Sequence, residues 1–312
     1  MEKINQSFWG FIYGDTFGLP VEFLERDSFS IKTLEGYGSW AVPAGTWSDD
    51  SAMMFVTMDH LIRNTSLDDL KRAFCDWKYR GFWTYNYEPS FDVGFTIAEV
   101  LERWEHISLN EQAKSDELSN GNGALMRILP IAFYTYNMTE EKAIETIKDY
   151  ASLTHGHIRS TLCSIHYCKV VHALLNGKAF LEAIHFANDA VEPMLNMYED
   201  EKLIFDRVFR AHLLSRNEIK SSGYVVDTLE AVYWSLANSE NYYDAIHKAV
   251  HLGKDTDTIA ALTGGLAGLI YDELNIPDDW PSQIPRRDQI EKLISNFVNL
   301  LINKLDASEK IF

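Results

Sequence analysis

Two short acidic segments stand near opposite ends of the chain, and each precedes a run of apolar residues at helical spacing. They are residues 48–51, with the sequence SDDS, and residues 255–258, with the sequence DTDT. If the fold brings the two helix starts together, four carboxylates and several hydroxyls meet at one point. Hard cations make such a cluster tolerable, because buried carboxylates repel one another. Oxygen-only ligation suits magnesium, manganese or calcium and argues against zinc.

Helix capping is the simpler explanation for either acidic segment taken alone. Serine and aspartate are preferred at the N-cap, and a carboxylate near a helix start is favoured by the helix dipole. One cap needs only one side chain, however, and each segment carries two carboxylates. The second segment also precedes a small-residue stretch, 264–268, that suits close packing inside a core. Carboxylates at the entrance of a buried helix need compensation, so we favour a metal-dependent enzyme.

Composition narrows the classes of partner. The 312 residues include 46 acidic and 28 basic side chains, for a formal net charge of −18. This charge disfavours binding to nucleic acid or to an anionic membrane, whereas a small anionic substrate stays possible beside bound divalent metals. The three cysteines lack metal-binding spacing, and we expect buried, reduced thiols. With no signal peptide or membrane-spanning run apparent, we expect a cytoplasmic protein and a monomer.

Apolar residues recur at steps of three and four along much of the chain, which is the spacing of amphipathic helices. The clearest helices are expected at 70–78, 139–153, 158–175, 180–194 and 290–305. Strand-like alternation is scarce, and no linker or internal repeat divides the sequence. The pattern predicts one compact all-α domain.

Glycines mark two places where the backbone must come close to another group. Residues 14–22 (GDTFGLPVE) are expected to break a helix-like start at 8–13, and residues 121–127 (GNGALMR) are expected to open another helix. Glycines before a helix start can aim free N–H groups at a phosphate, although a loop followed by an Asn-capped helix is the better explanation for 121–127 taken alone. His155 and His157 lack a third metal ligand at readable spacing, so we rank capping or ligand contact at a helix junction above metal binding.

Taken together, these motifs resemble the ADP-ribosylglycohydrolase family, which includes dinitrogenase-reductase-activating glycohydrolases and ADP-ribosyl-acceptor hydrolases. The matching segments follow the family's order, at 14–22, 45–51, 122–127, 153–155, 223–229 and 253–258. The two acidic motifs together are quite specific, and the others are strong only jointly. The resemblance implies an orthogonal multi-helix domain spanning 1–312. It also implies a central cleft with two metal ions at its base, Mg²⁺ or Mn²⁺.

The resemblance also implies roles for individual residues. The expected metal ligands are Ser48, Asp49, Asp50, Asp255, Asp257 and Thr258. Ser48 stands where the family more often has threonine, and the hydroxyl is kept. The expected catalytic carboxylates are Glu22, Asp49, Asp92 and Asp257. Four residues are expected at the nucleotide, with Asn122 and Gly123 facing the diphosphate and His155 and Tyr224 flanking the ADP-ribose.

The implied activity is metal-dependent hydrolysis of the N- or O-glycosidic bond between ADP-ribose and a protein side chain. Its substrate would be an ADP-ribosylated protein, and its product ADP-ribose. The alternatives are a non-catalytic binding or structural relative and a hydrolase of a small ADP-ribose derivative. A nucleotide pyrophosphatase is disfavoured, because those enzymes place acidic pairs along helices rather than at helix starts beside hydroxyls. The linkage, through arginine, serine or another side chain, stays open.

Overall fold

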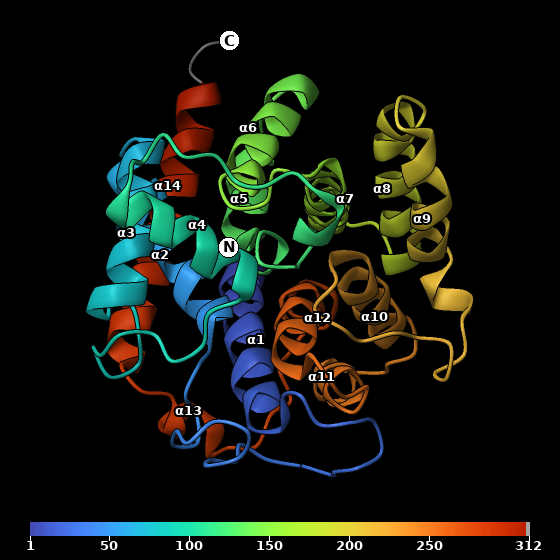
Figure 1. Cartoon of the computed structure of the whole chain (residues 1–312). Helices are drawn as coiled ribbons and strands as arrows, with labels where there is room; N and C mark the ends of the chain where they lie inside the picture. The colour runs from blue at the N-terminus through green and yellow to red at the C-terminus, as the bar shows by residue number, and fades with distance from the viewer. Residues whose placement is uncertain (310–312) are drawn as a thin grey trace.

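The computed structural model describes residues 1–309, which form helices joined by loops and contain no strand (Figure 1). The all-α prediction is confirmed. The longer helices are α1 (Glu2–Gly18), α2 (Asp49–Arg63), α3 (Leu67–Arg80), α4 (Phe95–His106), α5 (Leu129–Thr135), α6 (Glu140–Ser152), α7 (Ile158–Leu175), α8 (Phe180–Leu195), α9 (Glu199–Phe209), α10 (Val225–Ala237), α11 (Tyr242–Val250), α12 (Thr256–Ile270) and α14 (Arg287–Glu309). The short α13 (Trp280–Gln283) precedes α14.

The five helices expected from apolar spacing are all present, as α3, α6, α7, α8 and α14. Three of them start after a capping side chain: Ser66 begins α3 with a reciprocal bond to Asp69, and Thr139 accepts from the backbone of Lys142 at the start of α6. His157 caps α7 by accepting from the backbone N–H of Arg159, which confirms the capping interpretation of that histidine. Local hydrogen bonding therefore sets these boundaries.

The predicted break in the first helix was wrong, because α1 continues through Gly14 to Gly18. The glycines serve close packing instead. A Cβ on Gly14 would lie 2.1 Å from the carbonyl oxygen of Ala260, and one on Gly10 would lie 2.4 Å from that of Gly264. The backbones of α1 and α12 therefore touch at the centre of the molecule (Figure 1). This contact places Asp15, inside α1, next to the start of α12.

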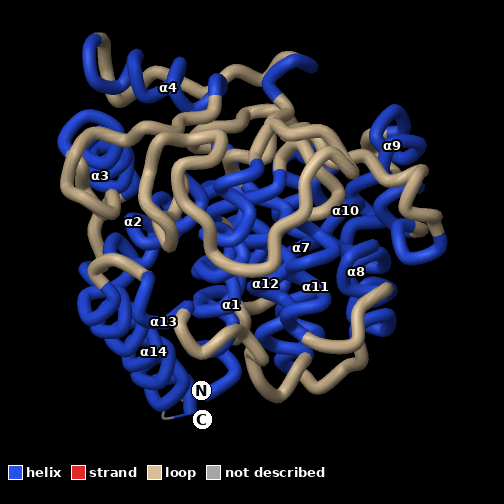
Figure 2. Tube along the Cα trace, turned by 90° about the horizontal axis from the view of Figure 1, so that it is seen from below, coloured by secondary structure: helices blue, strands red, loops and turns tan. Residues whose placement is uncertain are grey.

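The other helices surround the central pair. Helix α2 packs against α14, and α10 and α11 pack against α12. Figure 2 shows that many of the loops gather on one side of the molecule, together with α4. Cys75, Cys163 and Cys168 are buried and form no disulfide, as expected for reduced thiols. Among the described residues, no helix combines the length and apolar character needed to cross a membrane.

Candidate active site

The start of α2 is held by a side chain from another helix. Asp15 on α1 accepts hydrogen bonds from the backbone N–H groups of Ser48 and Ser51, at 3.0 and 3.1 Å. The Ser48 hydroxyl also accepts from the backbone N–H of Asp50, at 3.2 Å. Ser48 and Asp15 therefore satisfy the helix start, and the carboxylates of Asp49 and Asp50 are not needed as caps.

The two acidic segments meet, although Asp50 and Thr258 are 208 positions apart in the sequence. The Thr258 hydroxyl donates to Asp50 Oδ2 at 3.2 Å, and the Ser48 hydroxyl donates to the same oxygen at 3.0 Å. At the start of α12, the Asp257 carboxylate accepts from the backbone N–H of Thr258 at 3.0 Å. The expected convergence of the two helix starts is thus present in the structure.

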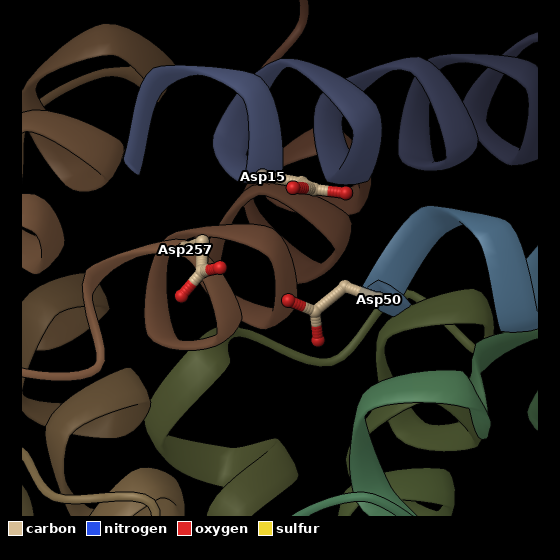
Figure 3. A group of neighbouring side chains, drawn as sticks. All are labelled: Asp15, Asp50 and Asp257. Atoms are coloured by element: carbon tan, nitrogen blue, oxygen red, sulfur yellow. The ribbon is translucent and has the colours of Figure 1, made fainter. Parts of the chain in front are cut away.

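Five buried carboxylates form two groups that share one member. Asp15, Asp50 and Asp257 each offer an oxygen atom within 4.8 Å of the others, and Figure 3 shows these three side chains between α1, α2 and α12. Glu22, Asp92 and Asp257 form a second group under the same limit. Asp257 thus lies at the centre of the cluster, where its carboxylate could help to hold a divalent cation.

Burial raises the pKa values of the carboxyl groups in this cluster and of Asp49 beside it. Desolvation raises the pKa of Asp15 to about 6, that of Asp49 to about 7 and that of Glu22 to about 8. Burial, reinforced by neighbouring carboxylates, raises the pKa values of Asp50 and Asp257 well above the usual range. These directions show that negative charge here is costly without compensation.

The cluster fits divalent cations on its own chemistry. Within residues 1–305, no lysine, arginine or histidine forms an ion pair with any of these carboxylates. Asp50 Oδ1 is buried and has no hydrogen-bond partner among the described residues. Carboxylate and hydroxyl oxygens are the ligands that magnesium and manganese prefer. The residues present therefore match a hard-cation site.

A cleft of about 880 Å³ opens over the carboxylates. Its lining includes all four expected catalytic residues, Glu22, Asp49, Asp92 and Asp257, and also Asn122, Gly123, His155, Asp255 and Thr258. Ser48 and Asp50 are buried and do not line it. Tyr224 is likewise absent from the lining: its ring lies 5.8 Å from the guanidinium of Arg159, and its backbone pairs with Gly121.

The glycine loop is fastened to the start of α12. The Asn122 amide donates to Asp255 Oδ2 at 2.6 Å and to the Thr228 hydroxyl at 3.0 Å. A Cβ on Gly123 would lie 2.6 Å from Cδ1 of Ile97, which leaves no room for a side chain. The expected helix after the loop begins as a 3-10 turn, Leu125–Arg127, before α5.

Glu22 is held in place by contacts that the sequence did not indicate. Its Oε2 accepts from Trp40 Nε1 at 2.6 Å. The next residue, Phe23, has a φ of 67°, and Lys254 has a φ of 65°. These two residues pair, with the Phe23 N–H donating to the Lys254 carbonyl at 2.6 Å. Such backbone conformations are unfavourable for residues other than glycine and are often found at functional sites.

Aromatic side chains form part of the cleft mouth, and we call Phe23, Trp40 and Phe91 the aromatic rim. The ring centroid of Trp40 lies 6.0 Å from that of Phe23 and 5.3 Å from that of Phe91. Phe23 is 66% exposed, and the carboxylate-bearing Glu25 also lines the cleft. Neither the rim nor the role of Asp15 was identified from sequence, because no local motif marks contacts between distant segments.

Known proteins resemble this chain over nearly its whole length. The family model described as ADP-ribosylglycohydrolase matches residues 1–307. The ADP-ribosylarginine hydrolase Tri1 of Pseudomonas putida (strain GB-1) is 29% identical, covering 98% of this chain and 81% of the relative. The ADP-ribosyl-[dinitrogen reductase] glycohydrolase of Rhodospirillum rubrum is 26% identical, covering 95% and 94%. A solved structure described as an ADP-ribosylglycohydrolase-related protein complex shares the fold, with a TM-score of 0.75 and 23% identity over 96% of this chain and 98% of its own.

Proposed function

The chain belongs to the ADP-ribosylglycohydrolase family, and from this premise we propose that it releases ADP-ribose from a modified protein side chain by hydrolysis. The family resemblance noted from sequence is confirmed, and with it the predicted enzyme class. The observation that carries the proposal is the pair of buried carboxylate groups that share Asp257 beneath the cleft. So costly a cluster argues against a purely structural relative, which would have no ion to hold.

Two divalent cations, Mg²⁺ or Mn²⁺, are proposed as the cofactor. The residues that would hold them are Ser48, Asp49, Asp50, Asp255, Asp257 and Thr258. Asp15 has both carboxylate oxygens engaged by backbone N–H groups of α2, so we assign it the positioning of that helix start. When bound, such a metal pair can hold ribose hydroxyls and lower the pKa of a water molecule.

The carboxyl groups that line the cleft supply the proton chemistry. Glu22 has a pKa raised to about 8 by burial, and burial also raises the pKa of Asp92 well above its usual range. A carboxyl group that titrates near neutral pH can give a proton to a leaving group or take one from water. The departing sugar carbon gains positive charge, which neighbouring carboxylates stabilise.

The nucleotide end of the substrate is proposed to lie along the glycine loop. Asn122 and Gly123 would face the diphosphate, and His155 lines the same cleft. The cleft volume, about 880 Å³, is within the range of sites that enclose a ligand of this size. Tyr224 would then act indirectly, through the backbone pairing that holds Gly121.

We propose arginine as the linkage that is cleaved. One relative at 29% identity is named an ADP-ribosylarginine hydrolase. The aromatic rim and Glu25 also offer the two surfaces that a guanidinium prefers, namely aromatic faces and a carboxylate. A serine side chain, which is small and neutral, would gain little from either.

Defined peptides test this proposal. The protein is incubated with arginine-linked and serine-linked ADP-ribosyl peptides, with and without magnesium, and the products are identified by mass spectrometry. We expect magnesium-dependent release from the arginine-linked peptide. Release from the serine-linked peptide alone would overturn the linkage. No release from either peptide, together with measurable ADP-ribose binding, would favour the binding-protein alternative.

A further inference from the structure

Arg127 places a positive charge in the core with few partners. Its side chain is fully buried, and its guanidinium carbon lies 4.9 Å from the ring centroid of Phe74. Nη2 donates to the Tyr150 carbonyl at 3.0 Å and to the Thr154 hydroxyl at 2.8 Å, while Nε and Nη1 have no partner among the described residues. Burial lowers the pKa of Arg127 to about 9, so the group stays charged at neutral pH. An apolar side chain would fill this space at lower cost, which points to a role beyond packing.

The Thr154 hydroxyl links Arg127 to a histidine. Thr154 is fully buried, and its Oγ1 lies 2.9 Å from His155 Nδ1. Because a guanidinium can only donate, Thr154 Oγ1 is the acceptor in its bond with Arg127. The hydroxyl proton is then free to point elsewhere, and Nδ1 is the only acceptor within hydrogen-bond distance of it among the described residues. The hydroxyl oxygen has a second lone pair that an Nδ1–H could use, but the hydroxyl proton would then lack an acceptor among the described residues. Donation to Nδ1 avoids this loss, and Nδ1 then carries no proton of its own.

The proton of the neutral imidazole must then be on Nε2. Burial, together with the charge of Arg127, lowers the pKa of His155 to about 3, so the ring is neutral at physiological pH. The Nε2 edge of the ring faces the glycine loop: a Cβ on Gly121 would lie 3.5 Å from Nε2, and one on Gly123 would lie 2.9 Å from Cε1. His155 also lines the cleft. The ring therefore turns an N–H group toward the space beside the loop.

We propose that Arg127 and Thr154 are positioning residues that fix His155 as the Nε2–H tautomer. The ring then donates a hydrogen bond to an anionic diphosphate oxygen of the bound nucleotide. This inference rests on the proposed function, which supplies ADP-ribose as that nucleotide. It also gives a common role to segments 121–127 and 153–155, because Arg127 of the first contacts Thr154 of the second. In a chain with a net charge of −18, a fixed N–H donor beside a buried guanidinium gives an anion a favourable place to bind.

Nitrogen-15 NMR of the whole protein reads the tautomer directly. Long-range ¹H–¹⁵N correlation distinguishes Nδ1–H from Nε2–H imidazole, and the His155 signals are assigned by their loss in His155→Gln. We expect the Nε2–H pattern at neutral pH in the wild type without nucleotide. Thr154→Val removes the hydroxyl and nearly keeps the shape of the side chain. We expect the His155 spectrum of this variant to show a mixture of the Nε2–H and Nδ1–H tautomers. Thr154→Ser keeps the hydroxyl and should restore the Nε2–H pattern.

Calorimetry with ADP-ribose measures the consequence. Thr154→Val should weaken ADP-ribose binding about tenfold to a hundredfold, the range expected for a lost hydrogen bond to a charged group. Thr154→Ser should bind like the wild type. The magnesium-induced rise in melting temperature serves as the control for the fold and the metal site, and it should be equal in all three proteins.

Three results would overturn the inference. An Nδ1–H pattern in the wild type, or an unchanged pattern in Thr154→Val, would remove the tautomer lock. A lost pattern with unchanged ADP-ribose affinity in Thr154→Val would remove the donor role of the ring. Failure of the proposed function gives a different result: the wild type would show the Nε2–H pattern but bind no ADP-ribose. That result would also exclude the donor role of the ring.

Discussion

Asn122 and Asp255 lie 133 positions apart, and the amide of Asn122 donates to Asp255 Oδ2 over 2.6 Å. This bond fastens the glycine loop to the segment that begins α12. Because Asp255 is a proposed metal ligand and Asn122 lies on the proposed diphosphate loop, the two halves of the site share one hydrogen bond. A disturbance at Asn122 should therefore reach both ligands.

Replacing Asn122 and Gly123 separately tests this coupling. Asn122→Leu should weaken both magnesium and ADP-ribose binding, by roughly tenfold or more, because it leaves a buried carboxylate oxygen without its donor. Gly123→Val should weaken ADP-ribose binding and leave magnesium binding nearly intact, because the new side chain meets Ile97 and His155 rather than a carboxylate. Titration calorimetry on both ligands measures the difference. A purely nucleotide-specific loss in Asn122→Leu would contradict the coupling.

Metal binding should stabilise the folded protein. Magnesium or manganese should raise the melting temperature, because the ions bind the folded state and not the unfolded chain. Asp257→Asn should abolish most of this shift, since Asp257 belongs to both carboxylate groups. Without metal, the same variant should melt no lower than the wild type, because an amide at this buried position needs neither a proton nor a cation to compensate it. An unchanged wild-type melting curve over a wide titration would argue against the site, and a binding stoichiometry of one would remove the second ion.

The metal-free protein should lose stability as the pH rises. The pKa values of Asp15, Asp49 and Glu22 in the folded state are raised to about 6, 7 and 8, above their unfolded values of about 4. These carboxyl groups therefore hold more protons in the folded state than in the unfolded chain. Between about pH 6.5, above which the buried histidines are neutral in both states, and pH 8, the unfolding free energy falls as the pH rises. Magnesium should flatten this slope by replacing protons as the compensating charge. Melting temperatures across this range, in chelator and in magnesium, test both statements; a flat metal-free profile would refute the first.

Glu22 should matter more for turnover than for binding. Glu22→Gln should lower kcat more than it weakens ADP-ribose affinity, because it removes a titrating group and little volume. Trp40→Phe keeps an aromatic ring and loses the donor to Glu22 Oε2, so we expect a smaller loss of kcat, about tenfold. Release of ADP-ribose followed by chromatography gives kcat, with circular dichroism as the folding control. Asp49→Ala, folded but without release, is the inactive reference; equal rates for Glu22→Gln and the wild type would exclude a role in the reaction.

Close packing of α1 and α12 should be intolerant of a single methyl group. Gly14→Ala should cost about 1–3 kcal/mol or more of unfolding free energy, because its Cβ would lie 2.1 Å from the Ala260 carbonyl oxygen. The control is Gly94→Ala, whose Cβ would meet nothing within 4 Å; because Gly94 is the N-cap of α4, this variant should lose only the cap preference, less than about 1 kcal/mol. Chemical denaturation measures both. Equal stability of the two variants would mean that the helices separate at little cost.

Local chemistry explains what the sequence alone determined. Helix α7 matches its predicted bounds of 158–175, because apolar spacing and the His157 cap are both encoded in adjacent residues. The sequence also indicated what a meeting of residues 48–51 with 255–258 would produce, because carboxylates beside hydroxyls suit a common cation, and the family resemblance implied that the two segments meet. The metal-binding candidates came from the family resemblance, whose motifs are recognised by residue type and order along the chain.

Only the tertiary structure decided which distant groups serve one another. Helix α1 continues through Gly14 because contact with α12 outweighs the helix-propensity cost of glycine, about 1 kcal/mol relative to alanine. Asp15 caps a helix 33 positions away, and Trp40 orients Glu22 from 18 positions away. Such hydrogen bonds depend on how helices pack, and packing of remote segments leaves no periodic signal in the chain.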